Sequence, residues 1–226
     1  MEQTSITPSS QETRLGWCFF AFGYLLLPQL VIRLLSGCGD AFSNFFYHLL
    51  LSLGVLLIFR RPLLCSLRRS LRKPGQLSIV CLLALIAHYF SLWAVTRTIL
   101  LVQPEFVNRN NQVIQAMTRQ QWLLTGITTV LLAPVEEETL FRCLLFQQLR
   151  DKSRWGAYVL SALCFGLIHL LGFLGSCTAE QFLLSLVQYL PVGLILAWSF
   201  DKTGSLTAPI VVHAIINAVS MVQILS

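Results

Sequence analysis

The feature that most constrains this chain is a succession of apolar stretches, each about as long as a membrane is thick. Roughly 20 residues of α-helix cross about 30 Å of hydrocarbon. Backbone groups in lipid must be bonded within their own segment, and the alternating pattern of a membrane β-barrel is absent from the sequence. The sequence therefore predicts an all-α, polytopic transmembrane helical bundle of about seven spans. The candidate spans are, approximately, 15–35, 42–60, 77–98, 122–148, 157–175, 181–200 and 205–225.

Composition supports a membrane protein. Of the 226 residues, 55% are apolar and only 12% are charged, which is outside the range of ordinary soluble domains. The first apolar run is too long, and too soon followed by another, for a cleaved signal peptide, so we count it as a span. No internal repeat or low-complexity segment divides the chain. We expect a single transmembrane domain over residues 1–226.

The basic residues predict the orientation in the membrane. The net charge is +6, but the cations lie in short gaps between spans, which indicates a topology signal rather than a nucleic-acid-binding surface. We expect both basic gaps to face the cytoplasm, with the N-terminus inside and the C-terminus outside. The first gap holds Arg60, Arg61, Arg68, Arg69, Arg72 and Lys73, and the second holds Arg150, Lys152 and Arg154.

The cysteines predict neither a disulfide framework nor a metal site. They are odd in number, scattered, mostly within apolar runs, and lack CxxC or CxxH spacing, which is typical of buried thiols. No metal and no cofactor is expected. The seven are Cys18, Cys38, Cys65, Cys81, Cys143, Cys164 and Cys177.

Three adjacent carboxylates and an arginine interrupt the fourth apolar run, in the segment 133–142. Near a helix centre each ionised residue costs about 2.5–3.5 kcal/mol, whereas each large apolar residue returns only about 0.3–0.6 kcal/mol. The segment must therefore face polar partners or a water-filled cavity, unless its carboxylates lie at the interface or take up protons. In the simpler alternative the helix ends at Pro134, and the carboxylates lie in interfacial water with a routine ion pair to Arg142.

Helical spacing indicates which of these charges cooperate. Glu138 and Arg142 are four residues apart and lie on one face, and Glu137 lies about a quarter-turn away. Glu136 lies further round the helix from the face of Glu138 and Arg142. Glu137 and Glu138 are therefore the better candidates for chemistry.

Two later spans carry polar residues that match this chemistry. His169 lies deep in the fifth span, and His213 and Asn217 lie four apart on one face of the last span. A lone intramembrane histidine is more often a packed residue bonded to a neighbouring helix. Together, however, the three helices supply a base, a second proton-handling group and hydrogen-bond donors, which hydrolysis by an activated water molecule requires.

The remaining polar features are interpreted as structural. His48 and His88, on the second and third spans, have no comparable partner nearby in the sequence and are assigned structural or interfacial roles. The stretch from about 100 to 121 is polar and rich in Asn and Gln. It is interpreted as a plain connector, with an interfacial helix or a substrate-gating element as the alternative.

Three short motifs follow one another on successive hydrophobic segments. They are Glu137-Glu138-x-x-x-Arg142, Phe165-x-x-x-His169 and His213-x-x-x-Asn217, with Phe141 and the run 201–210 as flanking matches. In this order they resemble the motifs of the CAAX protease and bacteriocin-processing (CPBP, or Abi) family, whose best-known class is the type II CAAX prenyl endopeptidase. The resemblance covers roughly residues 120–220, the expected catalytic core.

The resemblance implies an all-helical core with a catalytic cavity inside the membrane. By position, Glu137 would be the general base and would act with His169 to activate water against a peptide carbonyl. His213 and Asn217 would stabilise the tetrahedral oxyanion. A cavity of low dielectric constant raises a carboxylate pKa towards the operating pH, so the implied chemistry is coherent.

By the same resemblance, Arg142 would hold the glutamate pair in place and Glu138 would support the site. The sequence departs from the family pattern at two positions. Cys143 follows the arginine where the family usually has glycine, and Glu136 extends the pair to a triplet. Neither change removes an expected catalytic group.

The predicted function is hydrolysis of a peptide bond in a membrane-embedded or lipid-associated peptide or protein, within the lipid bilayer. The short chain favours a bacterial inner membrane. One alternative is a zinc-dependent membrane protease, although HExxH is absent and the motif holds more acid and fewer histidines than zinc sites usually do. A second is a non-proteolytic scaffold or bacteriocin-immunity protein. A third is a proton-coupled transporter, for which inverted halves would be expected and none is recognisable.

Overall fold

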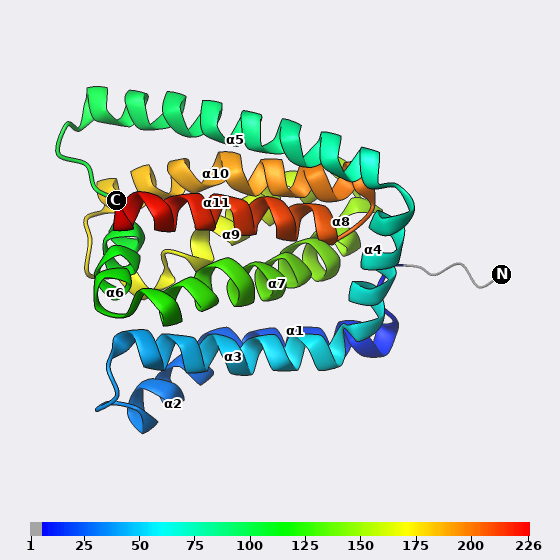
Figure 1. Cartoon of the computed structure of the whole chain (residues 1–226), viewed down its shortest axis with the longest axis horizontal. Coiled ribbons are helices and arrows are strands. Elements are labelled where there is room, and N and C mark those ends of the chain that lie inside the picture. Colours follow the sequence, from blue (N-terminus) through cyan, green and yellow to red (C-terminus); the bar gives the residue numbers. More distant parts are fainter. Residues whose placement is uncertain (1–5) are drawn as a thin grey trace.

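The computed structural model describes residues 6–226, and this part of the chain folds into helices without a β-strand. Figure 1 shows the long helices lying side by side along the longest axis of the molecule. Helix α1 (Ser10–Leu25) begins at the end where α4 (Arg60–Arg72) lies, and α11 (Thr207–Leu225) finishes at the opposite end. The predicted all-α fold is confirmed.

In the N-terminal half, the bent pair α1 and α2 packs against α3, and the short helix α4 then leads to the long helix α5. A capping box starts α1, in which the Ser9 hydroxyl accepts from the backbone N–H of Glu12 and the Glu12 carboxylate accepts from that of Ser9. The bounds are α1 Ser10–Leu25, α2 Leu27–Leu34, α3 Asp40–Ile58, α4 Arg60–Arg72 and α5 Pro74–Val102.

The C-terminal half begins with one long helical run that adopts a π-helical hydrogen-bond register twice and returns to the α-helical register each time. Two π-helical segments, η1 and η2, lie on either side of the short helix α7, and such segments are frequent at functional sites. The bounds are α6 Arg109–Gly126, η1 Ile127–Leu132, α7 Ala133–Glu138, η2 Thr139–Phe146, α8 Gln147–Arg150, α9 Arg154–Ile168, η3 Leu171–Phe173, α10 Ala179–Thr203 and α11 Thr207–Leu225.

The protein is a multi-pass membrane protein. Within residues 6–226, the four helices α3, α5, α10 and α11 are long and apolar enough to cross a bilayer, and the pair α1 and α2, bent by 44°, makes a fifth if it forms one span. The expected number of seven is not reached by this measure. Helix α9 has only 15 residues, and the run from α6 to α8 begins with a polar helix.

Large apolar side chains cover the outside of the bundle. Along α5, Ile79, Leu82, Ile86, Phe90 and Trp93 are all exposed. In water such a stripe would be unfavourable, whereas in a bilayer it faces lipid tails that are equally apolar. The outer face of α5 is therefore adapted to hydrocarbon.

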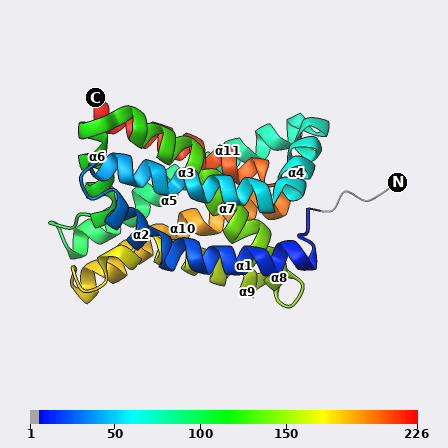
Figure 2. The same ribbon diagram turned by 90° about the horizontal axis from the view of Figure 1, so that it is seen from below.

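Helix α4 lies across one end of the bundle and links α3 to α5 (Figures 1 and 2). It is fixed to the turn between α10 and α11, where Arg69 Nη1 donates to the Gly204 carbonyl at 2.9 Å and the Ser205 hydroxyl donates to the Ser66 carbonyl at 2.9 Å. Gly204 adopts a φ of 58°, which a glycine adopts without strain, and this ends α10. The first predicted basic gap is thus a helix packed on the end of the C-terminal half.

The plain connector expected over residues 100–121 is wrong. Helix α5 continues to Val102, and α6 begins at Arg109, where the Asn108 side chain accepts from the backbone N–H of Asn111. Only six residues separate the two helices. The Asn- and Gln-rich stretch is therefore mostly helical, and its position in the bundle bears on the site.

Candidate active site

The three glutamates of α7 lie in the protein interior and point to different neighbours. Glu136 and Glu138 are 0% exposed and Glu137 is 7% exposed. The helix does not end at Pro134, since helical backbone continues through it into α7 and η2. The simpler interpretation, with carboxylates in interfacial water, is therefore wrong.

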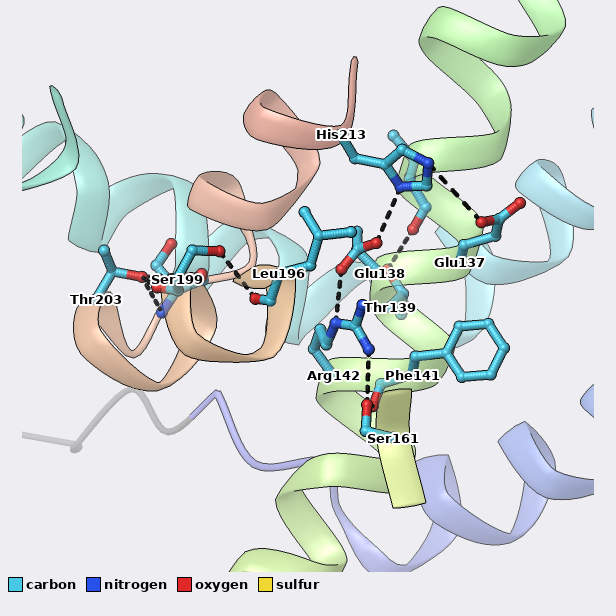
Figure 3. A network of polar contacts seen from close by, with 12 residues as sticks. Glu137, Glu138, Thr139, Phe141, Arg142, Ser161, Leu196, Ser199, Thr203 and His213 are labelled. Carbon is cyan, nitrogen blue, oxygen red and sulfur yellow. Dashed lines mark hydrogen bonds and ion pairs between the residues drawn. The ribbon is translucent and has the colours of Figure 1, made fainter. Parts of the chain in front are cut away.

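Glu138 belongs to a fully buried ion-pair network (Figure 3). Arg142 Nε donates to Glu138 Oε2 at 2.9 Å, and Arg142 Nη1 donates to the Ser161 hydroxyl at 2.6 Å. The guanidinium carbon also lies 5.2 Å from the centroid of the Phe165 ring, within the range of a cation–π interaction. These contacts join η2 to α9 and offset the desolvation of the two charges.

His213 connects this network to the middle glutamate. Its Nδ1 lies 2.9 Å from Glu138 Oε1, and its Nε2 lies 4.0 Å from Glu137 Oε2 (Figure 3). A carboxylate only accepts hydrogen bonds, so Nδ1 of His213 is the protonated donor. The second ring nitrogen is thereby directed at Glu137.

His169 approaches Glu137 from α9. Its Nδ1 lies 2.8 Å from the Phe165 carbonyl, which also only accepts, and its Nε2 lies 3.6 Å from Glu137 Oε2. The ring is stacked on Tyr189 of α10 with centroids 4.7 Å apart. Its orientation is therefore set from two sides.

Glu137 differs from the other two glutamates in its hydrogen bonding. Among the described residues, no hydrogen bond to Glu137 is found, and its Oε2 is buried. Glu136 Oε2 is also buried without a partner, but the other oxygen of Glu136 pairs with His48. Glu138 is fully engaged by Arg142 and His213, whereas Glu137 is only approached by the two Nε2 atoms. A buried acceptor without a partner is unfavourable, which is typical of a group kept available for a ligand.

Asn217 is held by a backbone group that the π-helical register leaves free. In η1 the N–H of Ala133 bonds to the Thr128 carbonyl, five residues back. The next donor in that register would be residue 134, but Pro134 has no N–H. The Thr129 carbonyl instead accepts from Asn217 Nδ2 at 2.7 Å. The proline thus provides the anchor that orients this amide.

A cavity of about 620 Å³ connects these side chains. Glu137, His169, His213 and Asn217 all line it, together with residues of α3, α5, α6 and α10. Glu138 and Arg142 lie behind this wall, since both are fully buried and neither lines the cavity. The structure therefore brings all six predicted residues into one cluster, four at the cavity surface and two supporting them.

Sequence reasoning missed the contribution of α3 and α5. His48 pairs through Nδ1 with Glu136 Oε1, and both His48 and His88 line the cavity. Their assignment to structural or interfacial roles did not anticipate this position. One signal was available, because Asn44 and His48 are four residues apart on an apolar span, the same spacing as the pair on α11.

Helix α6 also forms part of the wall. Asn110 Nδ2 donates to the Tyr189 hydroxyl at 2.9 Å, and Asn108 Nδ2 donates to Gln188 Oε1 at 2.9 Å. Tyr189 is the ring on which His169 stacks. The start of α6 is therefore linked through one side chain to the imidazole beside Glu137.

Within residues 6–226, no group of three or more His, Cys, Asp or Glu side chains is arranged to hold a metal ion. The two histidines beside Glu137 each bond through Nδ1 to a protein acceptor, which leaves only Nε2 of each ring directed at the carboxylate.

Comparisons with known proteins agree with the motif pattern. Residues 119–219 match the family model described as type II CAAX prenyl endopeptidase Rce1-like. The chain is also 29% identical over 191 residues to an "Uncharacterized 24.3 kDa protein" of Escherichia coli, a match that covers 83% of this chain and 82% of the relative. No solved structure matches the chain.

Proposed function

We propose that this membrane protease, whose residues 119–219 match the Rce1-like family of type II CAAX prenyl endopeptidases, hydrolyses its substrate with a water molecule activated by Glu137. One observation carries this proposal. Glu137 Oε2 is buried without a hydrogen-bond partner among the described residues, and it lies 3.6 Å and 4.0 Å from the Nε2 atoms of His169 and His213.

In the first step, water bound beside Glu137 loses a proton to the carboxylate as its oxygen forms a bond with the substrate carbonyl carbon. His169 Nε2 is the acceptor side of a ring whose Nδ1–H is bonded to the Phe165 carbonyl, so it can orient the same water molecule. The carbonyl π electrons move to its oxygen, which becomes an oxyanion. A positioned base of this kind contributes about 10²–10⁴-fold to the rate.

Two donors face the developing oxyanion. Glu138 accepts from Nδ1–H of His213 and stabilises the doubly protonated ring, whose Nε2–H then donates into the cavity. Asn217 uses one amide hydrogen on the Thr129 carbonyl and retains the second. Because both donors are held before the reaction, they stabilise the transition state without reorganisation.

In the second step the tetrahedral intermediate collapses and the C–N bond breaks. The proton taken up by Glu137 passes to the leaving nitrogen, which departs as a neutral amine. The new carboxyl group is released with it, and Glu137 returns to its ionised form. No atom outside the chain, the water and the substrate is required for this balance.

We propose a membrane-embedded or lipid-associated peptide or protein as the substrate, cleaved in a bacterial inner membrane. The cavity lies among helices that are adapted to lipid, and one relative comes from Escherichia coli. Its volume of about 620 Å³ accommodates a few residues of an extended peptide rather than a folded domain. We expect local unwinding of the substrate to precede cleavage.

The test is cleavage of a tagged membrane-peptide library by purified protein in proteoliposomes, with and without a chelator. We expect Glu137→Gln and His213→Ala each to lose at least about a hundredfold in rate. Glu180→Gln, at an exposed glutamate in the first turn of α10, is the matched control and should cleave normally.

Undiminished cleavage by Glu137→Gln would overturn the mechanism. Loss of wild-type activity on chelation, with recovery on adding zinc, would support the zinc-dependent alternative. Absence of cleavage by every form would count against a protease and in favour of a non-proteolytic scaffold.

A further inference from the structure

We propose that Asn44 and His48 of α3 form a second peptide-binding subsite in the cavity, which holds one peptide group of an extended substrate. The proposal rests on the proposed function, because it concerns the substrate of the same cavity. It assigns a purpose to the third glutamate, Glu136, which lies outside the three motifs.

The glutamate triplet holds two histidines in the same way. Glu138 accepts from Nδ1 of His213 on α11, and Glu136 accepts from Nδ1 of His48 on α3. Glu137 lies between them in the sequence. In both pairs the carboxylate is fully buried while the imidazole retains some exposure, 16% for the His48 side chain and 7% for that of His213. Each glutamate therefore presents an imidazole to the cavity.

The partner residues repeat the same spacing in opposite directions along their helices. Asn44 precedes His48 by four residues, and Asn217 follows His213 by four. All four side chains line the cavity. Residues four apart share one face of a helix, so each helix offers an imidazole and a carboxamide to the same space.

The two pairs differ in what already occupies their amides. Asn217 is bonded to the Thr129 carbonyl, whereas no hydrogen bond from the Asn44 side chain to any described residue is found. Asn44 thus keeps both its carboxamide donors and its acceptor for a ligand. Its partial exposure reflects its place on the cavity wall.

The chemistry of this pair fits a peptide group. With Nδ1–H donated to Glu136, His48 Nε2 accepts a hydrogen bond, and a substrate N–H supplies it. The Asn44 amide donates to the adjoining carbonyl. A free carboxylate suits the subsite less, because two further carboxyl groups, those of Glu136 and Glu137, already lie nearby. Recognition through the backbone makes the subsite tolerant of substrate sequence.

The competing explanation is that the His48–Glu136 pair only joins α3 to α7. Such a clamp would make the protein less stable when removed but would leave peptide binding unchanged. Asn44 separates the two explanations, because its side chain makes no hydrogen bond within the described residues, so its removal breaks none.

The experiment measures peptide affinity in a background that does not cleave. The probe is a fluorescein-labelled decapeptide of alternating Leu and Ala, bound to Glu137→Gln protein in proteoliposomes and followed by anisotropy. We expect Asn44→Ala and His48→Ala each to raise Kd about fivefold, the effect of one lost hydrogen bond. Ser43→Ala, at the neighbouring position on α3, is the control and should bind as the parent does.

A set of probes with one N-methyl amide each locates the contact. The parent should lose affinity when one particular N–H is methylated, and His48→Ala should be insensitive to that same methylation. Equal Kd values for parent, Asn44→Ala and His48→Ala would overturn the subsite and leave the proposed mechanism intact. No binding by the parent would also overturn it, whereas cleavage retained by Glu137→Gln would overturn the mechanism alone. If His48→Ala does not fold, Asn44→Ala with the same probes decides.

Discussion

Two ion pairs, one in each half of the chain, differ in their surroundings. In the N-terminal half, Glu12 and Arg61 pair near one end of the bundle, and the Arg61 side chain is 48% exposed. In the C-terminal half, Glu138 and Arg142 pair at 0% exposure in the middle of the helical run. The family match over residues 119–219 includes the buried network and excludes the exposed pair. A charge that lipid and protein enclose needs fixed partners, and those partners make a recognisable motif.

The halves are nevertheless joined at the cavity. His48 and His88 come from α3 and α5, outside the matched residues, and line the same space as Glu137. The N-terminal half is therefore more than a lipid-facing cover. The motif-bearing half supplies the residues of the proposed chemistry, while the other half shapes the cavity in which that chemistry occurs.

The largest effect is expected where the buried pair is broken. Arg142→Gln leaves Glu138 buried without its cation, and we expect a loss of about 3–5 kcal/mol in the free energy of unfolding. Unfolding by SDS in mixed micelles measures it. A loss below about 1 kcal/mol would contradict the view that this network differs from a surface ion pair.

Pro134→Ala should separate stability from activity. The substitution restores an N–H that competes with Asn217 for the Thr129 carbonyl. We expect the cleavage rate to fall about tenfold, which is less than the fall caused by complete loss of one oxyanion donor. The fold should be at least as stable, because proline is unfavourable inside a helix.

Pro74→Ala is the control for this change. Pro74 starts α5, where a backbone N–H has no helical acceptor, and we expect no change in rate. Normal cleavage by Pro134→Ala, with an inactive Asn217→Ala beside it, would show that the freed carbonyl does not position the amide.

Packing between the matched helices α9 and α10 should tolerate little change. A Cβ at Gly193 would lie 2.8 Å from Ala162 Cα, so Gly193→Ala must push the two helices apart. We expect a loss of about 1–3 kcal/mol in stability. Gly75→Ala, at the start of α5 with nothing within 4 Å, should be neutral or stabilising by up to about 1 kcal/mol. Equal thermal midpoints for the two variants would contradict this contrast.

The smallest effect is expected at the exposed pair. Arg61→Gln removes the contact to Glu12 at 2.9 Å, and we expect a change of at most about 1 kcal/mol in the free energy of unfolding. The same measurement at high salt should narrow even that difference, because exposed charges are screened. A loss comparable to that of Arg142→Gln would remove the distinction between the two halves.

Much of the candidate site could be predicted from the sequence, because its residues recur at helical spacing on apolar runs. The pair Glu138 and Arg142 is local, and its four-residue spacing alone places the two groups on one face. The clustering of His169 and His213 around Glu137 followed from the need of each polar group for a partner in lipid. The catalytic roles of these residues stay a prediction for the cleavage assay to decide.

The rest could not be predicted, because it depends on which helices pack together. The pair His48 and Glu136 joins residues 88 positions apart. The spacing of Asn44 and His48 marks a polar face of α3, but nothing local says which helix that face meets. The position of α6 against α10 was likewise hidden in a stretch that was interpreted as a connector. Long-range pairing of this kind leaves no periodic signal along the chain.

The sequence alone indicates that the chain folds in lipid and that its buried charged groups need polar partners. Apolar runs of membrane length require a helical bundle in lipid, and three carboxylates with an arginine inside such a run require buried polar neighbours. Only the tertiary structure decided which neighbour each carboxylate meets. The π-helical segments and Pro134 set the rotation of α7, and the packing of α3, α9 and α11 around it directs Glu136 to His48, Glu138 to His213, and leaves Glu137 open to the cavity. Direction about a helix axis is fixed by contacts between helices, which spacing along one chain does not encode.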